Sequence, residues 1–401
     1  MEMEWKEVIR PLREDELDES LDLSCFAFQY ELTEEERAER KSFTLPGSIW
    51  GCFVGDKMAA KMTIHPLQLY INGQPIPMGG VASVATWPEF RRQGMVARLL
   101  RKGLEVMKAE GRTISCLHPF AISFYRKYGW ELYIDYVEYE LDASHLPKGL
   151  EASGTMTRVA RDPELLSGIY EAYAAQYNGM LARDARWWKY FVFRQKKGQA
   201  VVYRDGEGRA RGYMLYEMKN RQMKIGELIW LDMDAWAGLW KFIVHHDSMF
   251  QTITLKVPAD DPLPFLLDNP DARMVTTPYF MARLVDVAGF LGLYRFEGVG
   301  ESVSLQVKIT DRQAPWNDGC FEWAVAADGR AAVKRVDVEG EVDASPELQF
   351  ACDIGTLTAM LMGYKRPSAL HRFGRLKAEA RTIEMLELLV PRTSTYLSDY
   401  Y

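Results

Sequence analysis

The sequence predicts a protein of mixed α/β and α+β class with three consecutive domains. Its 401 residues suggest two to four domains, at roughly 100–200 residues each. Strand and helix patterns follow one another in nearly the same order in residues 1–150 and 151–286. From residue 287 onward the pattern changes to short strands followed by helices. We therefore expect domains over residues 1–150, 151–286 and 287–401.

The composition excludes several classes of protein. Hydrophobic residues make up 48% and charged residues 26%, which is the balance of an ordinary globular protein rather than a disordered one. A net charge of −7 argues against a nucleic-acid binder. The chain has no apolar run of membrane-helix length, and its acidic start, residues 1–6, is unlike a secretory signal. The five scattered cysteines lack a C-x-x-C pair, so we expect a cytoplasmic protein with reduced thiols and no metal.

The first domain opens with elements that local patterns predict. Residues 8–25 predict a helix, because acids at 14–16 precede an apolar stripe. Strands are predicted over 48–54 and 58–70, separated by a turn at 55–57. The pair Asn72-Gly73 indicates the next turn, and a strand of small and β-branched residues follows over 78–86.

A basic turn then leads into a helix pattern that runs to Ala109. The turn reads Arg91-Arg92-Gln93-Gly94-Met95-Val96. The start of a helix leaves backbone N–H groups unpaired at the positive end of the dipole, so it attracts anions. Gly94 has no Cβ and allows close approach, while the two arginines add charge-assisted donors. An ordinary solvated loop would look similar on these residues alone.

A second motif follows a short strand predicted over 113–118. It reads Phe124-Tyr125-Arg126-Lys127-Tyr128-Gly129-Trp130-Glu131 and leads into a strand over 132–141. This run resembles the late motif of the GNAT superfamily of N-acetyltransferases. Arg91-x-x-Gly94-x-Val96 resembles the phosphate loop of that family, although Val96 stands where Gly or Ala is usual.

The resemblance implies a GNAT fold that binds acetyl-CoA. Backbone groups of the 84–86 strand would hold the pantetheine arm, and the basic turn would hold the pyrophosphate. Tyr125 would act as general acid for the leaving thiolate, since a phenol can donate a proton; a core aromatic residue is the alternative. The cofactor residues implied are Val84, Ala85, Thr86, Arg91, Arg92, Gln93, Gly94, Met95, Val96 and Phe120.

The middle third repeats the order of the first domain in outline. A helix is predicted over 163–178 and another over 234–246, with strands over 200–204, 210–219, 224–231 and 252–257. No counterpart of Arg91–Gly94 precedes the second of these helices, which indicates a degenerate GNAT-like domain without cofactor. Trp187 and Trp188 are expected in a core or interdomain contact. His245 and His246 are adjacent and face different directions, so they predict no metal site.

The last third predicts strands over 300–310, 319–326, 330–335 and 348–352, then helices over 353–362 and 376–389. Asp353 is the expected N-cap of the first helix. This mix resembles a sterol-carrier-protein-like α+β domain, and a dimerisation lobe is the alternative. The chain stays aromatic to Tyr400 and Tyr401, so we expect its end to be tucked into the protein.

Taken together, the whole chain resembles the Eis (enhanced intracellular survival) family of N-acetyltransferases. That family implies a catalytic base in the terminal carboxylate, here on Tyr401 where Phe is usual, with Tyr125 as acid. It also implies small polycationic acceptors such as aminoglycosides and a homo-oligomer, a hexamer. A backbone amide near Val84 would stabilise the oxyanion.

Two other functions remain open from the sequence. One is a protein or peptide lysine N-acetyltransferase, and the other is a non-catalytic ligand- or lipid-binding protein with a relic first domain. The acids at Glu31, Glu34, Glu35 and Glu36 could bind a cationic amine or could form a solvated helix face. The net charge of −7 would attract polycationic amines.

Overall fold

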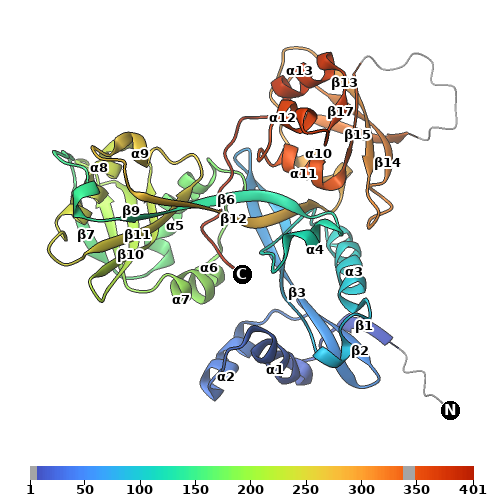
Figure 1. Cartoon of the computed structure of the whole chain (residues 1–401), viewed down its shortest axis with the longest axis horizontal. Coiled ribbons are helices and arrows are strands. Elements are labelled where there is room, and N and C mark those ends of the chain that lie inside the picture. The colour runs from blue at the N-terminus through green and yellow to red at the C-terminus, as the bar shows by residue number, and fades with distance from the viewer. Residues whose placement is uncertain (1–6, 337–347) are drawn as a thin grey trace.

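A computed structural model describes residues 7–336 and 348–401. These residues form one twelve-stranded sheet and one five-stranded sheet (Figure 1). The acidic stretch 1–6, where we expect no secretory signal, lies outside the described residues. Within the described part of the chain, no helix is both long and apolar enough to cross a bilayer.

The first part of the large sheet is built around two long strands, β3 and β4, which pair antiparallel along most of their length. Helix α3 packs against them with buried leucine and methionine side chains. The elements to residue 141 are β1 (Glu7–Pro11), α1 (Leu17–Phe28), α2 (Glu34–Phe43), β2 (Ile49–Val54), β3 (Lys57–Ile71), β4 (Gln74–Thr86), α3 (Met95–Ala109), β5 (Ile114–Leu117), α4 (Ile122–Arg126) and β6 (Glu131–Leu141).

The helix predicted over 8–25 is wrong in its first half. Residues Glu7–Pro11 form the edge strand β1, in which Val8 lies opposite Phe53 of β2. The acids at 14–16 form a single tight turn, where Glu16 accepts a hydrogen bond from the backbone of Arg13. Helix α1 therefore begins only at Leu17. Pairing with a distant strand outweighs the local helix signal here.

Strands β4 and β5 separate before β4 ends. Their parallel pairing runs from Met78 to Val81 of β4, while β4 remains paired with β3 as far as Thr86. The register between β3 and β4 shifts at this point, and Ser83 adopts a positive φ of 49°. One edge of β4 beyond Val81 is therefore left without a strand partner in the described residues, so the backbone groups of residues 84–86 on this edge are open to a ligand.

The middle third continues the same sheet on its other side. The predicted strands and helices are present, but the strands over 155–159 and 273–284 were not predicted. The elements are β7 (Thr155–Val159), α5 (Pro163–Ala174), α6 (Ala185–Trp187), a π-helical turn (Trp188–Val192), α7 (Phe193–Gln195), β8 (Gln199–Arg204), β9 (Ala210–Lys219), β10 (Gln222–Trp230), α8 (Met233–Val244), β11 (Thr252–Pro258), α9 (Leu263–Leu266) and β12 (Arg273–Leu284).

Strand β12 joins the two halves of the large sheet. It lies between β5 and β6 and pairs antiparallel with both. Strand β6 in turn pairs with β11. Figure 1 shows β6 and β12 side by side, bridging the two lobes. The first half of β12 is exposed and contains Pro278, so its sequence lacks the apolar pattern that would have revealed it.

The last third forms the separate five-stranded sheet with its helices (Figure 1). Asp353 caps α11 as predicted, accepting a hydrogen bond from the backbone of Thr356. The helix predicted from 376 begins at Ala380, because residues 377–378 pair with β16. The elements are α10 (Val287–Leu293), β13 (Val303–Thr310), β14 (Gly319–Val325), β15 (Ala331–Val336), β16 (Gln349–Asp353), α11 (Ile354–Leu361), α12 (Pro367–Arg372), β17 (Lys377–Ala378) and α13 (Ala380–Leu389).

After α13, residues 391–401, here called the tail, run back between the lobes to the middle of the molecule (Figure 1). Asn178 fixes the beginning of this path. Its backbone N–H donates to the carbonyl of Ser394 at 2.8 Å, and its carbonyl accepts from the N–H of Tyr396 at 3.1 Å. Tyr396 and Leu397 are buried, so the tail is tucked into the protein as expected.

Candidate active site

A large cavity, called the first cavity below, lies where β4 leaves β5. It has a volume of about 940 Å³ and is bounded by β4, the start of α3, and the segment from His118 to Tyr128. Of the predicted cofactor residues, nine line it: Val84, Ala85, Thr86, Arg91, Arg92, Gly94, Met95, Val96 and Phe120. Gln93 does not line it, because its side chain turns back to donate to the carbonyl of Glu89. Tyr125 and Tyr401 line the same cavity.

The start of α3 has the features of an anion-binding cradle. Gly94 is its N-cap residue with a φ of 78°, no side chain caps the helix, and its first turn contains no acid. Helix α2, by contrast, is capped by Thr33. Arg91 and Arg92 lie beside the free helix end and line the cavity. This donor set fits a pyrophosphate, because unpaired N–H groups, the helix dipole and two guanidinium groups all favour negative charge.

The unpaired edge of β4 forms the neighbouring wall. Residues 82–86 continue past the last β4–β5 pair and line the cavity. An extended strand edge offers alternating N–H and C=O groups to an extended ligand. This arrangement fits an amide-containing arm such as pantetheine, and it leads from the helix start toward Tyr125.

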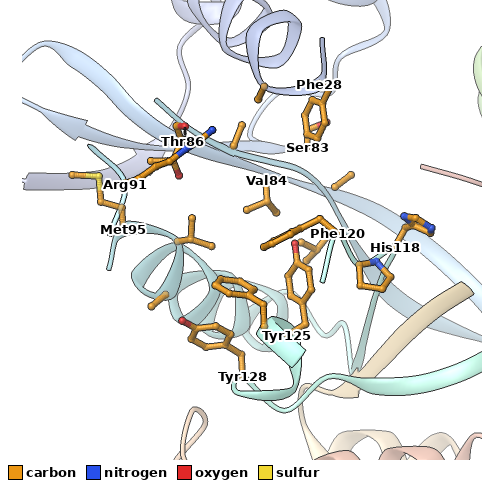
Figure 2. Close-up of a pocket in the computed structure, with 18 of the residues that line it drawn as sticks. Phe28, Ser83, Val84, Thr86, Arg91, Met95, His118, Phe120, Tyr125 and Tyr128 are labelled. Atoms are coloured by element: carbon orange, nitrogen blue, oxygen red, sulfur yellow. Dashed lines mark hydrogen bonds between the residues drawn. The ribbon is translucent and has the colours of Figure 1, made fainter. Parts of the chain in front are cut away.

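Tyr125 reaches the cavity from α4, and only 3% of its surface is exposed. Figure 2 shows its ring beside Phe120 with the hydroxyl directed toward Val84. Its ring packs edge-on against Phe120 and Phe124, with centroids 5.4 and 5.2 Å apart. Burial raises the pKa of the Tyr125 phenol above its usual value, so the group keeps its proton at neutral pH.

Tyr401 enters from the tail at the inner end of the cavity. Its ring lies 5.1 Å from Phe280 and 5.8 Å from Trp187, measured between ring centroids. A Cβ added at Gly80 would come within 2.9 Å of this ring, so the strand is shaped around it. Burial also raises the pKa of the Tyr401 phenol.

A second cavity of about 420 Å³ meets the first at Ala82, Ser83, Tyr400 and Tyr401, which line both. It is bounded by α1, α2, β3 and the segment 186–195. Four of its lining residues are basic and none is acidic: Arg40, Lys61, Arg186 and Arg194. The candidate acids Glu31, Glu34, Glu35 and Glu36 are not among the lining residues, although Glu36 lies close enough to Arg194 and Arg40, which do line the cavity, to interact with them electrostatically.

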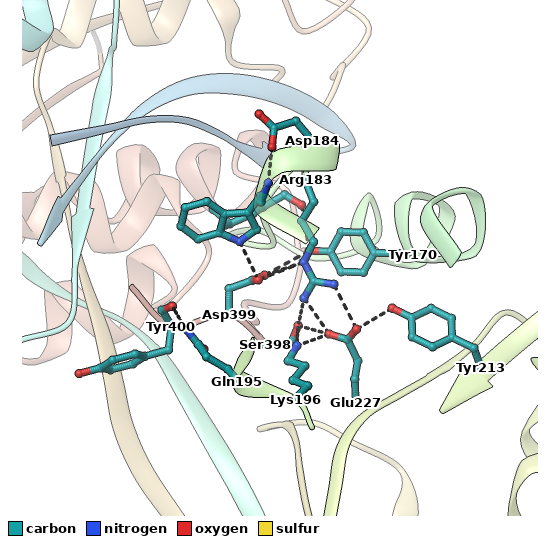
Figure 3. A network of polar contacts seen from close by, with 12 residues as sticks. Tyr170, Arg183, Asp184, Gln195, Lys196, Tyr213, Glu227, Ser398, Asp399 and Tyr400 are labelled. Atoms are coloured by element: carbon teal, nitrogen blue, oxygen red, sulfur yellow. Dashed lines mark hydrogen bonds and ion pairs between the residues drawn. The ribbon is translucent and has the colours of Figure 1, made fainter. Parts of the chain in front are cut away.

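A buried ionic network holds the tail at Asp399, two residues before Tyr401 in the chain (Figure 3). The Arg183 guanidinium donates to Asp399 at 3.0 Å and to Glu227 at 2.7 Å. Lys196 also pairs with Glu227. Although burial alone would raise it, Arg183 and Lys196 hold the pKa of Glu227 well below its usual range. The network contains two positive and two negative groups. Asp399 belongs to the tail and the other three groups belong to the middle lobe, so the network ties the tail to that lobe.

The sequence analysis missed this network, although it singled out the neighbouring tryptophans. Trp187 and Trp188 are both 1% exposed, which confirms their expected place in the core. The indole N–H of Trp187 donates to Asp399 at 3.0 Å. The sequence of segment 178–188 therefore drew attention to the right part of the chain. It did not reveal the partner of Trp187, because Asp399 lies 212 residues further along the chain.

Models of protein families match three parts of the chain. Two are acetyltransferase (GNAT) domain models, at residues 8–133 and 179–284, and the third is a sterol carrier protein domain model, at residues 287–398. Together they follow the order of the elements described above. The first contains the α3 cradle and Tyr125.

Curated relatives are similar to this chain over most of its length. N-acetyltransferase Eis of Mycobacterium tuberculosis is 24% identical over 356 residues, covering 82% of each chain. An uncharacterized N-acetyltransferase of Streptomyces avermitilis is 23% identical, covering 91% of this chain and 90% of the relative.

Among solved structures, a probable N-acyltransferase of Enterococcus faecalis V583 has a TM-score of 0.90 at 27% identity, covering 99% of this chain and 100% of that one. Eis1 of Mycobacterium abscessus has a TM-score of 0.81 at 21% identity, covering 98% of this chain and 100% of that one, which shows the shared fold. GNAT acetyltransferases use acetyl-CoA, and the first cavity fits it. The chain therefore belongs to the Eis-family GNAT N-acetyltransferases, with two GNAT domains followed by a sterol-carrier-protein-like domain.

Proposed function

We propose that this protein transfers the acetyl group of acetyl-CoA directly to an amino group of a small molecule, with Tyr125 as general acid and the α-carboxylate of Tyr401 as general base. The observation that supports this most is the first cavity, which brings the free start of α3, the open edge of β4, Tyr125 and Tyr401 together. Acetyl-CoA supplies an activated thioester. The chain must orient it, accept one proton and donate another.

Tyr125 suits the role of proton donor. Its phenol is held in its protonated form by burial, and its hydroxyl points into the cavity. A proton at this oxygen would be available to a departing sulfur. A backbone N–H on the open edge near Val84 would stabilise negative charge on the carbonyl oxygen.

The α-carboxylate of Tyr401 suits the role of proton acceptor. Tyr401 lines both cavities, which supports placing its α-carboxylate where an acceptor in the second would meet a thioester in the first. An α-carboxyl group has a pKa of about 3.5 in water, so it is ionised at neutral pH and able to accept a proton. Such a carboxylate would take a proton from the attacking amine directly or through water.

The proposal extends to the organisation of the chain. Residues 1–150 would be the catalytic domain, residues 151–286 a degenerate domain that holds the tail, and residues 287–401 the sterol-carrier-like domain that supplies it. The tail network at Arg183 and Asp399 supports this division of labour. A hexamer in the cytoplasm is the assembly and location that family resemblance implies, and the native mass would test the hexamer.

Aminoglycoside-like polycations are the acceptors that family resemblance implies, and the net charge of −7 supports attraction of such molecules. Lysines of proteins or peptides are the other amines to consider. The second cavity is lined by basic residues, so its charge affects which of these amines would bind there. A panel of amines would decide it.

The test is acetyl transfer by Tyr125→Phe, with Tyr128→Phe as a matched control in the same cavity. We expect Tyr125→Phe to lower kcat by 10²- to 10⁴-fold, about the contribution of a general acid, and to leave thermal stabilisation by acetyl-CoA intact. Tyr128→Phe should retain activity. Wild-type turnover in Tyr125→Phe would refute the acid role.

The base is tested separately. Tyr401→Phe keeps both the carboxylate and most of the ring, so it should remain active. Deleting Tyr401, or extending the chain by one glycine, should abolish transfer while acetyl-CoA still binds. Full activity after the extension would contradict the role of the carboxylate.

A further inference from the structure

We propose that the acceptor is an amine that also carries an anionic group, a carboxylate or a phosphate, and that the second cavity binds this group through Arg40, Arg186 and the serines held by Lys61. The inference rests on the proposed function, because it assigns the second cavity to the acceptor of the acetyl group. It differs from the polycationic acceptor that family resemblance implies.

The position of the second cavity suits an acceptor. It shares Ala82, Ser83, Tyr400 and Tyr401 with the first cavity, so the two meet at the bulge of β4. A molecule in the second cavity would therefore present its amine beside the tail and across from Tyr125. The rest of such a molecule would lie between α1, α2 and the segment 186–195.

The charges that line this cavity are of one sign. Arg194 is paired with Glu39 at 3.0 Å. Arg40, Lys61 and Arg186 have no carboxylate within ion-pair distance in the part of the chain that the structure describes. The α-carboxylate of Tyr401 would add a single negative charge, which Arg40 and Arg186 outnumber even where Lys61, with a pKa of about 7, has lost its proton.

The protein partners of these cations are neutral. Arg40 donates to the hydroxyl of Tyr30 at 2.7 Å, and Arg186 donates to the carbonyl of Phe43 at 3.0 Å. The Nε of Arg186 is buried and has no hydrogen-bond partner in the described residues. A buried guanidinium N–H without a hydrogen-bond acceptor destabilises the protein, and an anionic oxygen would supply that acceptor.

Lys61 is 2% exposed and has three oxygen acceptors, all uncharged. Its Nζ donates to the carbonyl and hydroxyl of Ser20 and to the hydroxyl of Ser24. Both serines line the cavity and accept from the lysine, so their own O–H groups remain available to donate toward the cavity. Serine hydroxyls beside a buried cation are suitable donors to a carboxylate or phosphate oxygen.

The cations also act on one another. Burial lowers the pKa of Lys61 to about 7, and Arg40 adds to this effect. Burial lowers the pKa of His65 to about 4, and Arg186 lowers it further. An anion in the cavity would relieve this repulsion, whereas a polycation would increase it. A buried lysine without a counterion destabilises the fold. Such a residue is explained if it contributes to binding a ligand.

The first experiment compares acceptors that differ by one anionic group. Lysine is paired with 1,5-diaminopentane, phosphoethanolamine with ethanolamine, and kanamycin serves as the polycation. We expect kcat/KM at saturating acetyl-CoA to be at least tenfold higher for the anionic member of a pair, and lowest for kanamycin. The two pairs also distinguish carboxylate from phosphate. Equal or better use of 1,5-diaminopentane or kanamycin would overturn the inference and leave the proposed acetyl transfer standing.

The second experiment measures binding without turnover. Isothermal titration with phosphoethanolamine and with lysine, in the presence of coenzyme A, should show affinity that ethanolamine and 1,5-diaminopentane lack. Anion-dependent binding without transfer would support the inference while contradicting the proposed function. Binding that does not depend on the anion would overturn the inference.

The third experiment places the anion in the cavity. Arg186→Gln and Lys61→Met should each raise KM for the preferred anionic acceptor about tenfold or more, with kcat largely retained. Arg194→Gln is the matched control, since its cation is already paired with Glu39, and it should change KM little. Arg40→Gln provides a further variant if Lys61→Met folds poorly. Unchanged KM in both Arg186→Gln and Arg40→Gln would refute the assignment.

Discussion

Replacing Asp399 with asparagine should release the end of the tail while the acetyl-CoA cavity remains intact. Asp399 is 3% exposed, and its carboxylate accepts from Arg183 at 3.0 and 3.1 Å and from the indole of Trp187 at 3.0 Å. Asparagine keeps the shape and one acceptor oxygen but removes the charge. Arg183 and Lys196 would then share only Glu227, which leaves one buried positive charge without a partner.

The cost follows from those contacts. Removing one partner of a buried ion pair destabilises by about 3–5 kcal/mol. Two charge-assisted hydrogen bonds, at about 1.5–3 kcal/mol each, give a similar sum. If the loss falls on the tail alone, about 3 kcal/mol raises the population of the open tail roughly a hundredfold. Tyr401 would leave the junction of the two cavities just as often.

The assay is hydrogen–deuterium exchange of the tail amides together with acetyl-transfer kinetics. In Asp399→Asn we expect exchange in residues 395–401 to rise about a hundredfold by the same estimate, and kcat to fall. The KM for acetyl-CoA should stay unchanged, because the substitution alters no residue of α3 that lines the first cavity. Ser398→Ala, which removes one neutral donor to Glu227, is the milder control. Unchanged exchange and unchanged kcat in Asp399→Asn would refute the view that this network positions Tyr401.

Three further predictions follow from other contacts. Gly94→Ala should raise KM for acetyl-CoA several-fold, because a left-handed φ of 78° and Arg98 at 2.9 Å oppose a Cβ; an unchanged KM would count against the cradle. Gly80→Ala should displace the Tyr401 ring and lower kcat without weakening acetyl-CoA binding in calorimetry, and equal losses of both would contradict this. Wild type should gain stability relative to Lys61→Met as pH rises from about 7 to 10, because unfolded lysine, with a usual pKa of 10.5, still binds the proton that folded Lys61 has lost; parallel melting temperatures across this range would disprove it.

Local sequence predicted most of the residues that come together at the first cavity. The turn 91–96 and the run 124–131 each contain, within a few residues, the groups that the fold places at the cavity. A helix start, a glycine and neighbouring arginines need no distant partner to form an anion cradle. The same holds for Asp353, whose capping contact lies three residues away.

Features that join distant segments were not predictable from the sequence. Arg183 and Asp399 are separated by 216 residues, and neither carries a local signal of its partner. The basic character of the second cavity arises where α2, β3 and the segment 186–195 converge. The first half of the helix expected over 8–25 was wrong for the same reason. Its residues form β1 because they pair with β2, which lies about forty residues further along the chain.

The insertion of β12 between β5 and β6 has a consequence for synthesis of the chain. Both strands lack their neighbour until β12 emerges, long after β6 has left the ribosome. At the usual rate of about 5–20 residues per second, the nascent first lobe would wait several seconds or more with two open strand edges. A fragment ending at residue 150 would keep these edges of β5 and β6 without β12, so we expect it to aggregate when expressed alone.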